Sequence, residues 1–516
     1  MRWVLVFLAI AVGCGRPPVA HPDLALQARA EAALLQGCYD CLLEARDGFS
    51  RLGAGEARPA WVARMFEVEL LLALRDKELG LSPAEPLATA RRLAAELPRD
   101  QQAARYLALV DEVPGEELSG APRALQQFWS AHQEPLRSLA ADRAWLARGP
   151  LGQPLGEYLR LALDCAHPER PAGGATSAAP PAKSGAPGAP PLLAYRAAIC
   201  GYGSIDALAA VRAREPRFVE TSFFIAKDEV VMMAHDGPAR ALPHLTEVLA
   251  RFPGSPALAH LMASYQAGMG NYGEAVRFDD RALAAFPEHD DARFGRLVAL
   301  SYLGRSQDAI DTATVLIDRH AVGLANAYYW RARNHRALAQ LTEARADITA
   351  AKELLTTPVV MSLAGMIEYD QRELDIAEAD LHAALDADPH DCDAQWYVGL
   401  VHQQRKQWRA AAQALDQTTT CFRERAAQTA AWQAALQARG ELDPAYRASA
   451  VAGYQASIDD DRRRQHLAAL NAAAMALAGS DFASARASIE VAAEDPSLAD
   501  QVARLRARLD RPRRTP

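Results

Sequence analysis

The chain has 516 residues, of which 50% are hydrophobic, and a formal net charge of -8 at pH 7. A chain of this length can form more than one domain with its own hydrophobic core. The acidic balance argues against binding of nucleic-acid phosphates as a main activity, because that activity requires clustered basic side chains. We therefore expect no nucleic-acid partner, and we interpret the basic cluster at 504–514 as a solvated helix end rather than a binding patch.

The first thirteen residues have the pattern of an export signal. Arg2 supplies a positive charge, an apolar run follows from Trp3 to Val12, and Gly13 precedes a cysteine. Such a run is too short to span a bilayer. We predict a signal peptide over residues 1–13, with Cys14 as the first residue of the exported protein.

The sequence AVGC at Ala11–Cys14 resembles a bacterial lipobox, although leucine is the usual residue at the place of Ala11. The resemblance implies that Cys14 carries a lipid. Gly15 stands where an aspartate would favour inner-membrane retention, so we expect an outer-membrane lipoprotein that faces the periplasm. An inner-membrane location and a secreted protein cut at another position remain the alternatives. No later apolar stretch approaches twenty residues, so a lipid anchor is the expected membrane attachment.

Residues 14–166 are predicted to form an N-terminal helical domain that resembles a helical repeat, because apolar residues recur at helical spacing from Asp23 to Cys165. Its acidic residues show no catalytic spacing and are expected on solvated helix faces; they include Asp40, Glu44, Glu67 and Glu69. Residues 167–191 are almost entirely Pro, Gly, Ala and Ser, which predicts a disordered linker.

Between Pro256 and Cys421 the sequence repeats every 33 to 35 residues as a pair of amphipathic helices. When the units start at Pro256, Asp290, Ala325, Pro358 and Cys392, an alanine occupies the twentieth position of each. These alanines are Ala275, Ala309, Ala344, Ala377 and Ala411. A small residue at a fixed position allows the two helices of a unit to pack closely. The period predicts an all-α solenoid of helical hairpins over residues 192–423.

The units resemble tetratricopeptide repeats, which have small residues at positions 8, 20 and 27, glycine near 15, an aromatic residue at 17 and proline at 32. The first unit matches at Ala263, Gly270, Tyr272, Ala275, Ala282 and Pro287. Further units are predicted near residues 222 and 466, the latter from Phe482 and Ala485. The remaining helices of residues 424–516 are expected to cap the solenoid.

The resemblance implies an inner groove lined by positions 2, 5, 9, 12 and 13 of each first helix. Aromatic and arginine residues, which dominate binding energy in interfaces, lie at several of these positions. The predicted partner-binding residues are Tyr302, Asn326, Tyr329, Arg333, Arg336, Tyr369 and Trp396. We expect the aromatic side chains to hold a protein or peptide segment and the arginines to pair with its carboxylates.

The cysteines are informative if the protein is exported, because disulfides form in oxidising compartments. Cys392 and Cys421 are expected at the same end of one hairpin, where a disulfide between them is geometrically sensible. Cys165 and Cys200 flank the predicted linker and are a second candidate pair. Cys38 and Cys41 have CxxC spacing in a helical context, which favours a local bridge or two packed thiols over a thioredoxin-like site.

No pattern indicates a catalytic, metal or cofactor site. The sequences at 288–291 and 390–393 combine histidine with aspartates, but they lie between units, where such residues cap the next helix. The sequence therefore predicts a non-enzymatic scaffold in the cell envelope, anchored through Cys14, that binds a protein or peptide partner. Two alternatives stay open: a structural or self-associating lipoprotein whose groove holds its own C-terminal helices, and an enzyme with an unrecognised site in residues 14–166.

Overall fold

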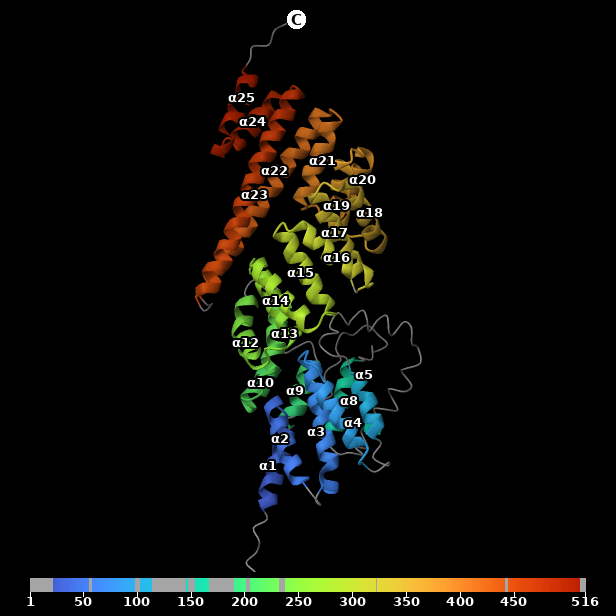
Figure 1. Cartoon of the computed structure of the whole chain (residues 1–516). Coiled ribbons are helices and arrows are strands. Elements are labelled where there is room, and N and C mark those ends of the chain that lie inside the picture. Colours follow the sequence, from blue (N-terminus) through green and yellow to red (C-terminus); the bar gives the residue numbers. More distant parts are fainter. Residues whose placement is uncertain are drawn as a thin grey trace, which may run out of the picture. The chain divides into compact units, whose positions relative to one another are not determined.

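The computed structural model describes residues 22–54, 58–97, 103–113, 145–146, 154–166, 190–200, 205–231, 237–321, 323–440 and 444–510. Within these ranges every regular element is a helix, which confirms the predicted all-α class (Figure 1). The signal peptide, the lipidation site Cys14 and residues 167–189 of the predicted linker lie outside the described residues. None of the described helices is both long enough and apolar enough to cross a bilayer.

The chain divides into two compact units, which are described separately. The first contains most of the described residues up to Phe218. Its helices are α1 (Pro22–Gln36), α2 (Tyr39–Leu52), α3 (Arg58–Glu78), α4 (Ala84–Ala94), α5 (Ala103–Glu112), α8 (Leu155–Ala166), α9 (Pro191–Cys200) and α10 (Ile205–Arg214). They enclose a core that includes the fully buried side chains of Phe49, Phe66, Tyr106 and Tyr158.

The division differs from the predicted start of the solenoid at residue 192, because α9 and α10 belong to the first unit. Helix α9 contacts α1 and α8. Its Tyr195 stacks on Phe218 with 4.9 Å between the ring centroids, and the Arg75 guanidinium lies 3.9 Å from the Tyr195 ring. Burial of these large side chains holds α9 in the N-terminal unit, a contact that the repeat period does not reveal.

The prediction that the acidic residues of this domain lie on solvated helix faces is wrong for two residues of α3. Glu67 is 0% exposed and Glu69 is 4% exposed. The Glu67 carboxylate accepts hydrogen bonds from Arg64 at 2.6 Å and from the Leu155 N–H at 3.1 Å. Glu69 has one oxygen with no hydrogen-bond partner among the described residues, and burial raises its pKa to about 7. These two carboxyl groups are thus buried inside the unit, and burial disfavours their charged form.

The second unit is an array of antiparallel helical hairpins in which an A helix alternates with a B helix. The first hairpin is α11 (Thr221–Val231) and α12 (Gly237–Arg251), and α12 continues as a helix through Pro243. Five units follow: α13 (Pro256–Gly268) with α14 (Tyr272–Ala285), α15 (Asp290–Tyr302) with α16 (Ser306–Asp318), α17 (Leu324–Ala337) with α18 (Leu341–Leu354), α19 (Pro358–Asp370) with α20 (Leu374–Ala387), and α21 (Cys392–Gln404) with α22 (Trp408–Gln437).

Small residues at fixed positions explain how these helices pack. The five alanines at position 20 are each at most 1% exposed. A Cβ atom added to Gly365, at position 8 of α19, would lie 2.6 Å from Leu381 Cγ, and one added to Gly399 would lie 2.7 Å from Leu415 Cγ. The A and B helices of a unit therefore approach so closely that a larger side chain would push them apart.

The turn between the A and B helices has the same backbone conformation in every unit. The residue at position 15 has a positive φ in all five units: Gly270, Gly304, Ala339, Arg372 and Lys406. Such a left-handed residue ends a helix and redirects the chain, and glycine adopts it without steric cost. Three units have a non-glycine residue at this place, so tertiary packing imposes the turn where the sequence does not favour it.

The turns between units use polar caps, as the sequence predicted for 390–393. The Asp391 carboxylate accepts hydrogen bonds from the N–H groups of Asp393 and Ala394, which caps α21. At 288–291 the cap is His289 rather than an aspartate, because its Nδ1 accepts the N–H of Ala292 at 3.2 Å. No group of His, Cys, Asp and Glu in the described residues has the geometry of a metal site.

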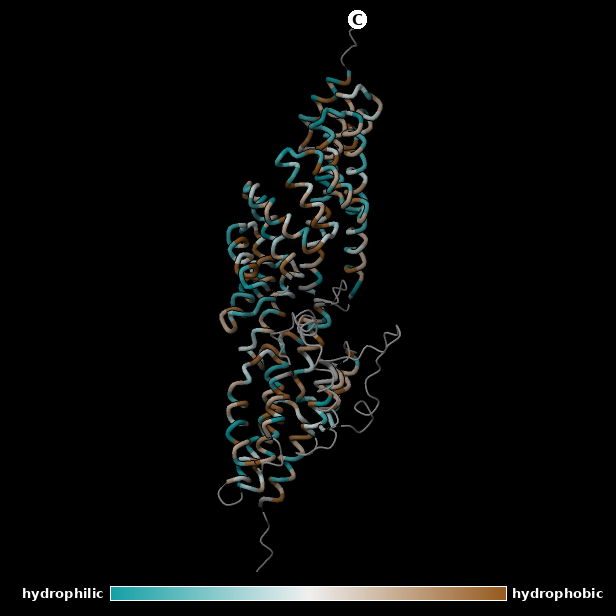
Figure 2. The backbone as a smooth tube through the Cα atoms, turned by 90° about the vertical axis from the view of Figure 1, so that its right-hand side faces the viewer, coloured by the Kyte–Doolittle hydropathy of each residue, from teal (hydrophilic) through white to brown (hydrophobic). Residues whose placement is uncertain are grey.

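The C-terminal helices extend the array and add a long hairpin. They are α23 (Pro444–Ala478), α24 (Phe482–Ala492), the short 3-10 helix η4 (Pro496–Leu498) and α25 (Ala499–Leu509). Helices α22 and α23, with 30 and 35 residues, are more than twice as long as the 13 or 14 residues of the other helices in the five units. Figure 2 shows that the helices of the chain carry both hydrophilic and hydrophobic residues.

Among the described residues, two disulfides connect neighbouring segments. Cys392 at the start of α21 is bonded to Cys421 in α22, and Cys38 is bonded to Cys41 at the start of α2. Cys38 and Cys41 are both fully buried, which fits a structural bridge rather than a reactive thiol pair. The backbones of Cys165 and Cys200 lie at the ends of α8 and α9, but their side chains lie outside the described residues, so this pairing stays a prediction.

Candidate protein-binding groove

The predicted groove residues lie on the A helices α15, α17, α19 and α21. Tyr302 is the last residue of α15 and is 51% exposed. Asn326, Tyr329, Arg333 and Arg336 are on α17, and the Asn326 side chain is exposed. These positions place four of the seven predicted residues on one helix, so α17 is the centre of the candidate site.

Tyr302, Tyr329 and Arg333 meet in one cluster together with two residues that the sequence analysis did not select. Tyr302 stacks on Tyr272 with ring centroids 4.6 Å apart, and its ring meets that of Trp330 edge to face at 5.7 Å. Tyr329 contacts the same Trp330 ring at 5.5 Å. We call these five residues the aromatic-arginine cluster: Tyr272, Tyr302, Tyr329, Trp330 and Arg333.

Arg333 is the charged member of the cluster. Its guanidinium carbon lies 5.3 Å from the Tyr302 ring centroid and 4.9 Å from that of Trp330, which is within the range of cation–π attraction. In the described part of the chain it has neither an ion pair nor a hydrogen bond, whereas Arg331 two residues earlier is paired with Asp347 at 2.7 Å. The Arg333 guanidinium therefore lies against two aromatic rings, and no described residue accepts a hydrogen bond from it.

Arg336 has a different environment because its guanidinium is already occupied. It donates to Asp370 Oδ2 at 2.6 Å and to the hydroxyl of Tyr397, and its side chain is 24% exposed. Burial also raises the pKa of Tyr397. An internal ion pair of this kind fixes α17 against α19 and α21, so we assign Arg336 to the packing of these helices rather than to direct capture of a carboxylate.

The other two predicted residues lie further along the array. Tyr369 contacts the Tyr397 ring edge to face at 5.3 Å, and the Gln404 amide lies 3.4 Å from its hydroxyl. Trp396 packs against Phe422 of α22 with 6.2 Å between the ring centroids. The structure thus brings Tyr302, Tyr329 and Arg333 together and places Arg336 and Tyr369 in a neighbouring polar group, while Trp396 contacts the C-terminal hairpin.

The sequence contains signals that could have identified the site residues that the groove pattern did not select. Trp330 and Tyr397 both occupy position 6 of their units, and Asp370 occupies position 13, which the groove pattern already included. A repeated aromatic residue at position 6 indicates a shared face. Tyr272, at position 17, belongs to the first turn of the B helix and reaches the cluster only because α13, α14 and α15 pack together.

Comparisons with known proteins give structural neighbours only. No family model and no curated protein matches the chain. The solved neighbours include YrrB, described as a TPR protein with an unusual peptide-binding site (18% identity, 34% of this chain, 91% of that chain, TM-score 0.29). A second is a tetratricopeptide repeat protein from Parabacteroides merdae (14% identity, 42% of this chain, 85% of that chain, TM-score 0.36). A third is the APC/C hetero-tetramer Cut9-Hcn1 (12% identity, 94% of this chain, 97% of that chain, TM-score 0.41).

The chain's own geometry, rather than these superpositions, defines its class. It is an all-α helical-repeat protein whose units share helix boundaries, buried alanines and a left-handed turn at position 15. The spacing of these features is that of the tetratricopeptide repeats that the sequence resembles, so the fold is a helical-repeat array of this kind.

Proposed function

We propose that the chain is a protein–protein interaction scaffold that binds an extended segment with an acidic side chain at the aromatic-arginine cluster. The observation that carries the proposal is Arg333, a partly exposed cation that lies on two aromatic rings and has no carboxylate partner among the described residues. An arginine that is held by ring contacts loses less freedom when it binds a carboxylate, and the half-exposed Tyr302 offers apolar contact area beside it.

We further propose that this scaffold works in the bacterial envelope, anchored by a lipid at Cys14 and facing the periplasm from the outer membrane. The lipobox-like sequence at Ala11–Cys14 supports the anchor. The bonded pairs Cys38–Cys41 and Cys392–Cys421 support an oxidising compartment, since such bonds are rare in the cytosol. A Cys14→Ser variant is expected to leave the membrane fraction of fractionated cells; retention of the variant there would contradict the anchor.

The binding site can be tested with random peptides displayed on phage and selected on the purified protein. We expect the selected sequences to share an Asp or Glu. Arg333→Ala should weaken the selected peptides by about 2 kcal/mol, or roughly 30-fold in Kd, because it removes a charge-assisted hydrogen bond. Arg333→Lys should have an intermediate effect, because lysine keeps the charge but not the planar fork.

A matched control is Arg277→Ala on α14, because Arg277 is an exposed arginine that already has an ion-pair partner, Glu274, at 2.7 Å. This variant should bind the peptides as the wild type does. Selected peptides without acidic residues, or equal affinity for the Arg333→Ala variant, would contradict the proposal.

A self-associating protein with an occupied groove is the second candidate function, because the C-terminal hairpin contacts the first repeat through Met269. The 51% exposure of Tyr302 favours the first candidate, because the described part of the hairpin does not cover this side chain. Light scattering of the purified protein separates the two: a monomer that binds peptide supports the scaffold, and a concentration-dependent dimer without peptide binding supports self-association.

A further inference from the structure

The long hairpin is an insertion between two consecutive repeat units. The second part of α23 and helix α24 repeat the pattern of the other units, with a unit start at His466: Ser480 at position 15 has a φ of 61°. Ala473, Ala485 and Ala492 at positions 8, 20 and 27 are all 0% exposed. The repeat that begins at residue 466 therefore continues the array, and residues 424–465 are additional to it. The packing of the repeats does not require residues 424–465, and the contacts of this hairpin indicate its role.

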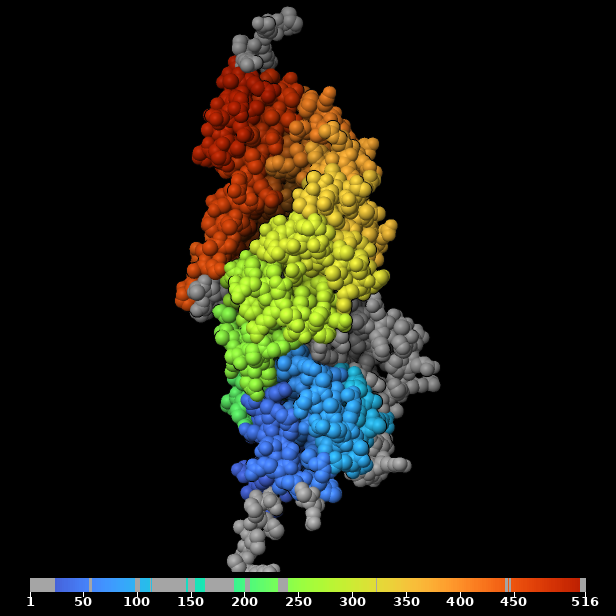
Figure 3. Space-filling view, in the orientation of Figure 1, coloured from blue at the N-terminus to red at the C-terminus, as the bar shows by residue number. Residues whose placement is uncertain are grey.

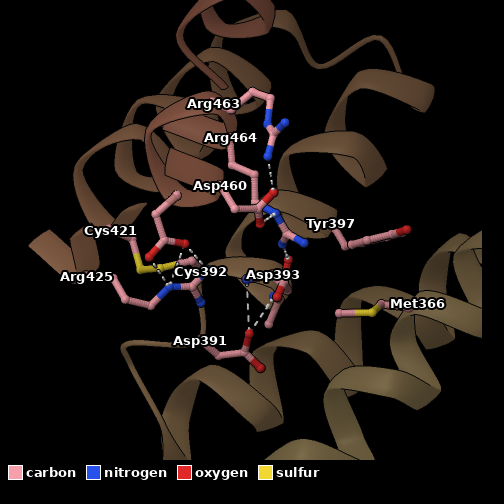
Figure 4. A network of polar contacts seen from close by, with 12 residues as sticks. Met366, Asp391, Cys392, Asp393, Tyr397, Cys421, Arg425, Asp460, Arg463 and Arg464 are labelled. Atoms are coloured by element: carbon pink, nitrogen blue, oxygen red, sulfur yellow. Dashed lines mark hydrogen bonds and ion pairs between the residues drawn. A yellow bond between two sulfur atoms is a disulfide. The ribbon is translucent and has the colours of Figure 1, made fainter. Parts of the chain in front are cut away.

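The base of the hairpin is fixed to the N-terminal end of α21 (Figure 4). The Cys392–Cys421 disulfide lies next to it, and Arg464 bridges Asp393 at 2.7 Å and Asp460 at 2.9 Å. In addition, the guanidinium of Arg425 donates hydrogen bonds to the buried carboxylate of Asp461, which joins the two arms. A covalent bond and several charge-assisted hydrogen bonds set the direction in which the hairpin leaves the array.

The tip of the hairpin contacts the opposite end of the five-unit array. Leu436 near the end of α22 is 2% exposed, and the residues packed around it are Met269, Ala450, Val451 and Tyr454. Met269 is the C-cap of α13, the A helix of the first of the five units. The hairpin therefore starts at the fifth unit and returns to the first, so the hairpin and the five units together form a closed loop.

Lengths are consistent with this arrangement. The arm from residue 444 to 465 spans roughly 30 Å at about 1.5 Å per residue. Four steps separate α13 from α21, which is an arc of roughly 40 Å if neighbouring A helices pack about 10 Å apart. The hairpin is thus long enough to be the chord of the arc. Figure 3 shows a recess between the orange-red hairpin and the yellow-green helices of the array.

We infer that the α22–α23 hairpin is the second wall of the groove, and that the closed loop admits an extended chain segment but not a folded domain. The inference rests on the proposed function, because the segment is the one that Arg333 and Tyr302 bind. A peptide with unfolded ends can enter between the walls, whereas a segment between two folded domains can enter only when the tip separates from Met269. The partner is accordingly an acidic segment of an unfolded or loosely structured chain.

A cross-link at the tip tests this inference. Cysteines at Met269 and Val451 are joined with a short bismaleimide, and the control is the same variant blocked with N-ethylmaleimide. The probes are an acidic peptide selected by phage display and the same peptide inserted between two ubiquitin domains. We expect the peptide with unfolded ends to bind both forms equally, and the cross-link to slow association of the domain-flanked peptide at least about tenfold.

A second variant protects the test against misfolding of the first. Leu436→Asp places a charge at the tip contact and should speed association of the domain-flanked peptide by about tenfold, with little change for the peptide with unfolded ends. Equal association of the domain-flanked peptide with the cross-linked and control forms overturns the inference and leaves the proposed function intact. Absence of peptide binding by every form overturns the proposed function, and the inference with it.

Discussion

The close contact between the helices of a repeat should make the protein's stability sensitive to substitution of Gly365. A Cβ at Gly365 would lie 2.6 Å from Leu381 Cγ and 3.0 Å from the backbone oxygen of Ala377, and both neighbours are fully buried. Overpacking of this kind costs about 1–3 kcal/mol, and the backbone oxygen can move little, so we take the upper part of that range. Alanine gains about 1 kcal/mol of helix propensity over glycine. The net effect of Gly365→Ala is therefore a destabilisation of about 1–2 kcal/mol.

Gly453 is the matched control, because it lies in the interior of α23 and nothing is within 4 Å of a Cβ added there. Gly453→Ala should stabilise the protein by about 1 kcal/mol through helix propensity alone. The assay is urea unfolding followed by circular dichroism, complemented by hydrogen exchange of α19 and α23, because a protein with two units need not unfold in one step. A Gly365→Ala variant as stable as the wild type would refute the close-packing argument.

Three other substitutions follow from the same structure. Replacing Cys392 and Cys421 by serine should lower the stability of the second unit by about 3–4 kcal/mol under oxidising conditions, as expected for a loop of 29 residues, and no loss in urea unfolding would contradict this. Ala339→Gly should stabilise the repeats by about 1 kcal/mol, because Ala339 has a φ of 57°; an equal or lower melting temperature would argue against strain at position 15. Burial raises the pKa of Glu69 to about 7 from 4.5, so the folded state binds more protons and wild-type stability falls as pH rises through that interval. Glu69→Gln should match the wild type near pH 4 and exceed it by up to about 3 kcal/mol at pH 8, and a pH-independent difference in unfolding free energy would contradict the assignment.

The sequence predicted the repeat frame accurately because the frame depends on local patterns. The structure begins its A helices at Pro256, Asp290, Leu324, Pro358 and Cys392, at or one residue from the predicted unit starts. Alanines at position 20 of every unit, and glycines at position 8 of two of them, allow the close packing within the units. These are interactions over a few turns of helix, which a periodic sequence displays directly.

The candidate site was only partly predictable. Position numbers identified Tyr302 and Arg333, but they could not distinguish Arg333, which has no ion-pair partner among the described residues, from Arg336, which pairs with Asp370 of the next A helix. The two arginines are three residues apart on one helix, and only the neighbouring units decide which has a partner. Trp330 was missed because it lies between positions that the family pattern assigns to the groove.

By itself, the sequence determined the all-α class, the length and register of the repeats and the positions where helices meet. The tertiary structure alone decided the burial of Glu67 and Glu69, the place of α9 in the first unit and the return of the hairpin to Met269. The physical reason is the distance along the chain over which each interaction acts. Helix periodicity and close packing repeat within a few dozen residues, whereas the contact of Arg464 with Asp393 joins residues 71 positions apart and leaves no periodic trace in the sequence.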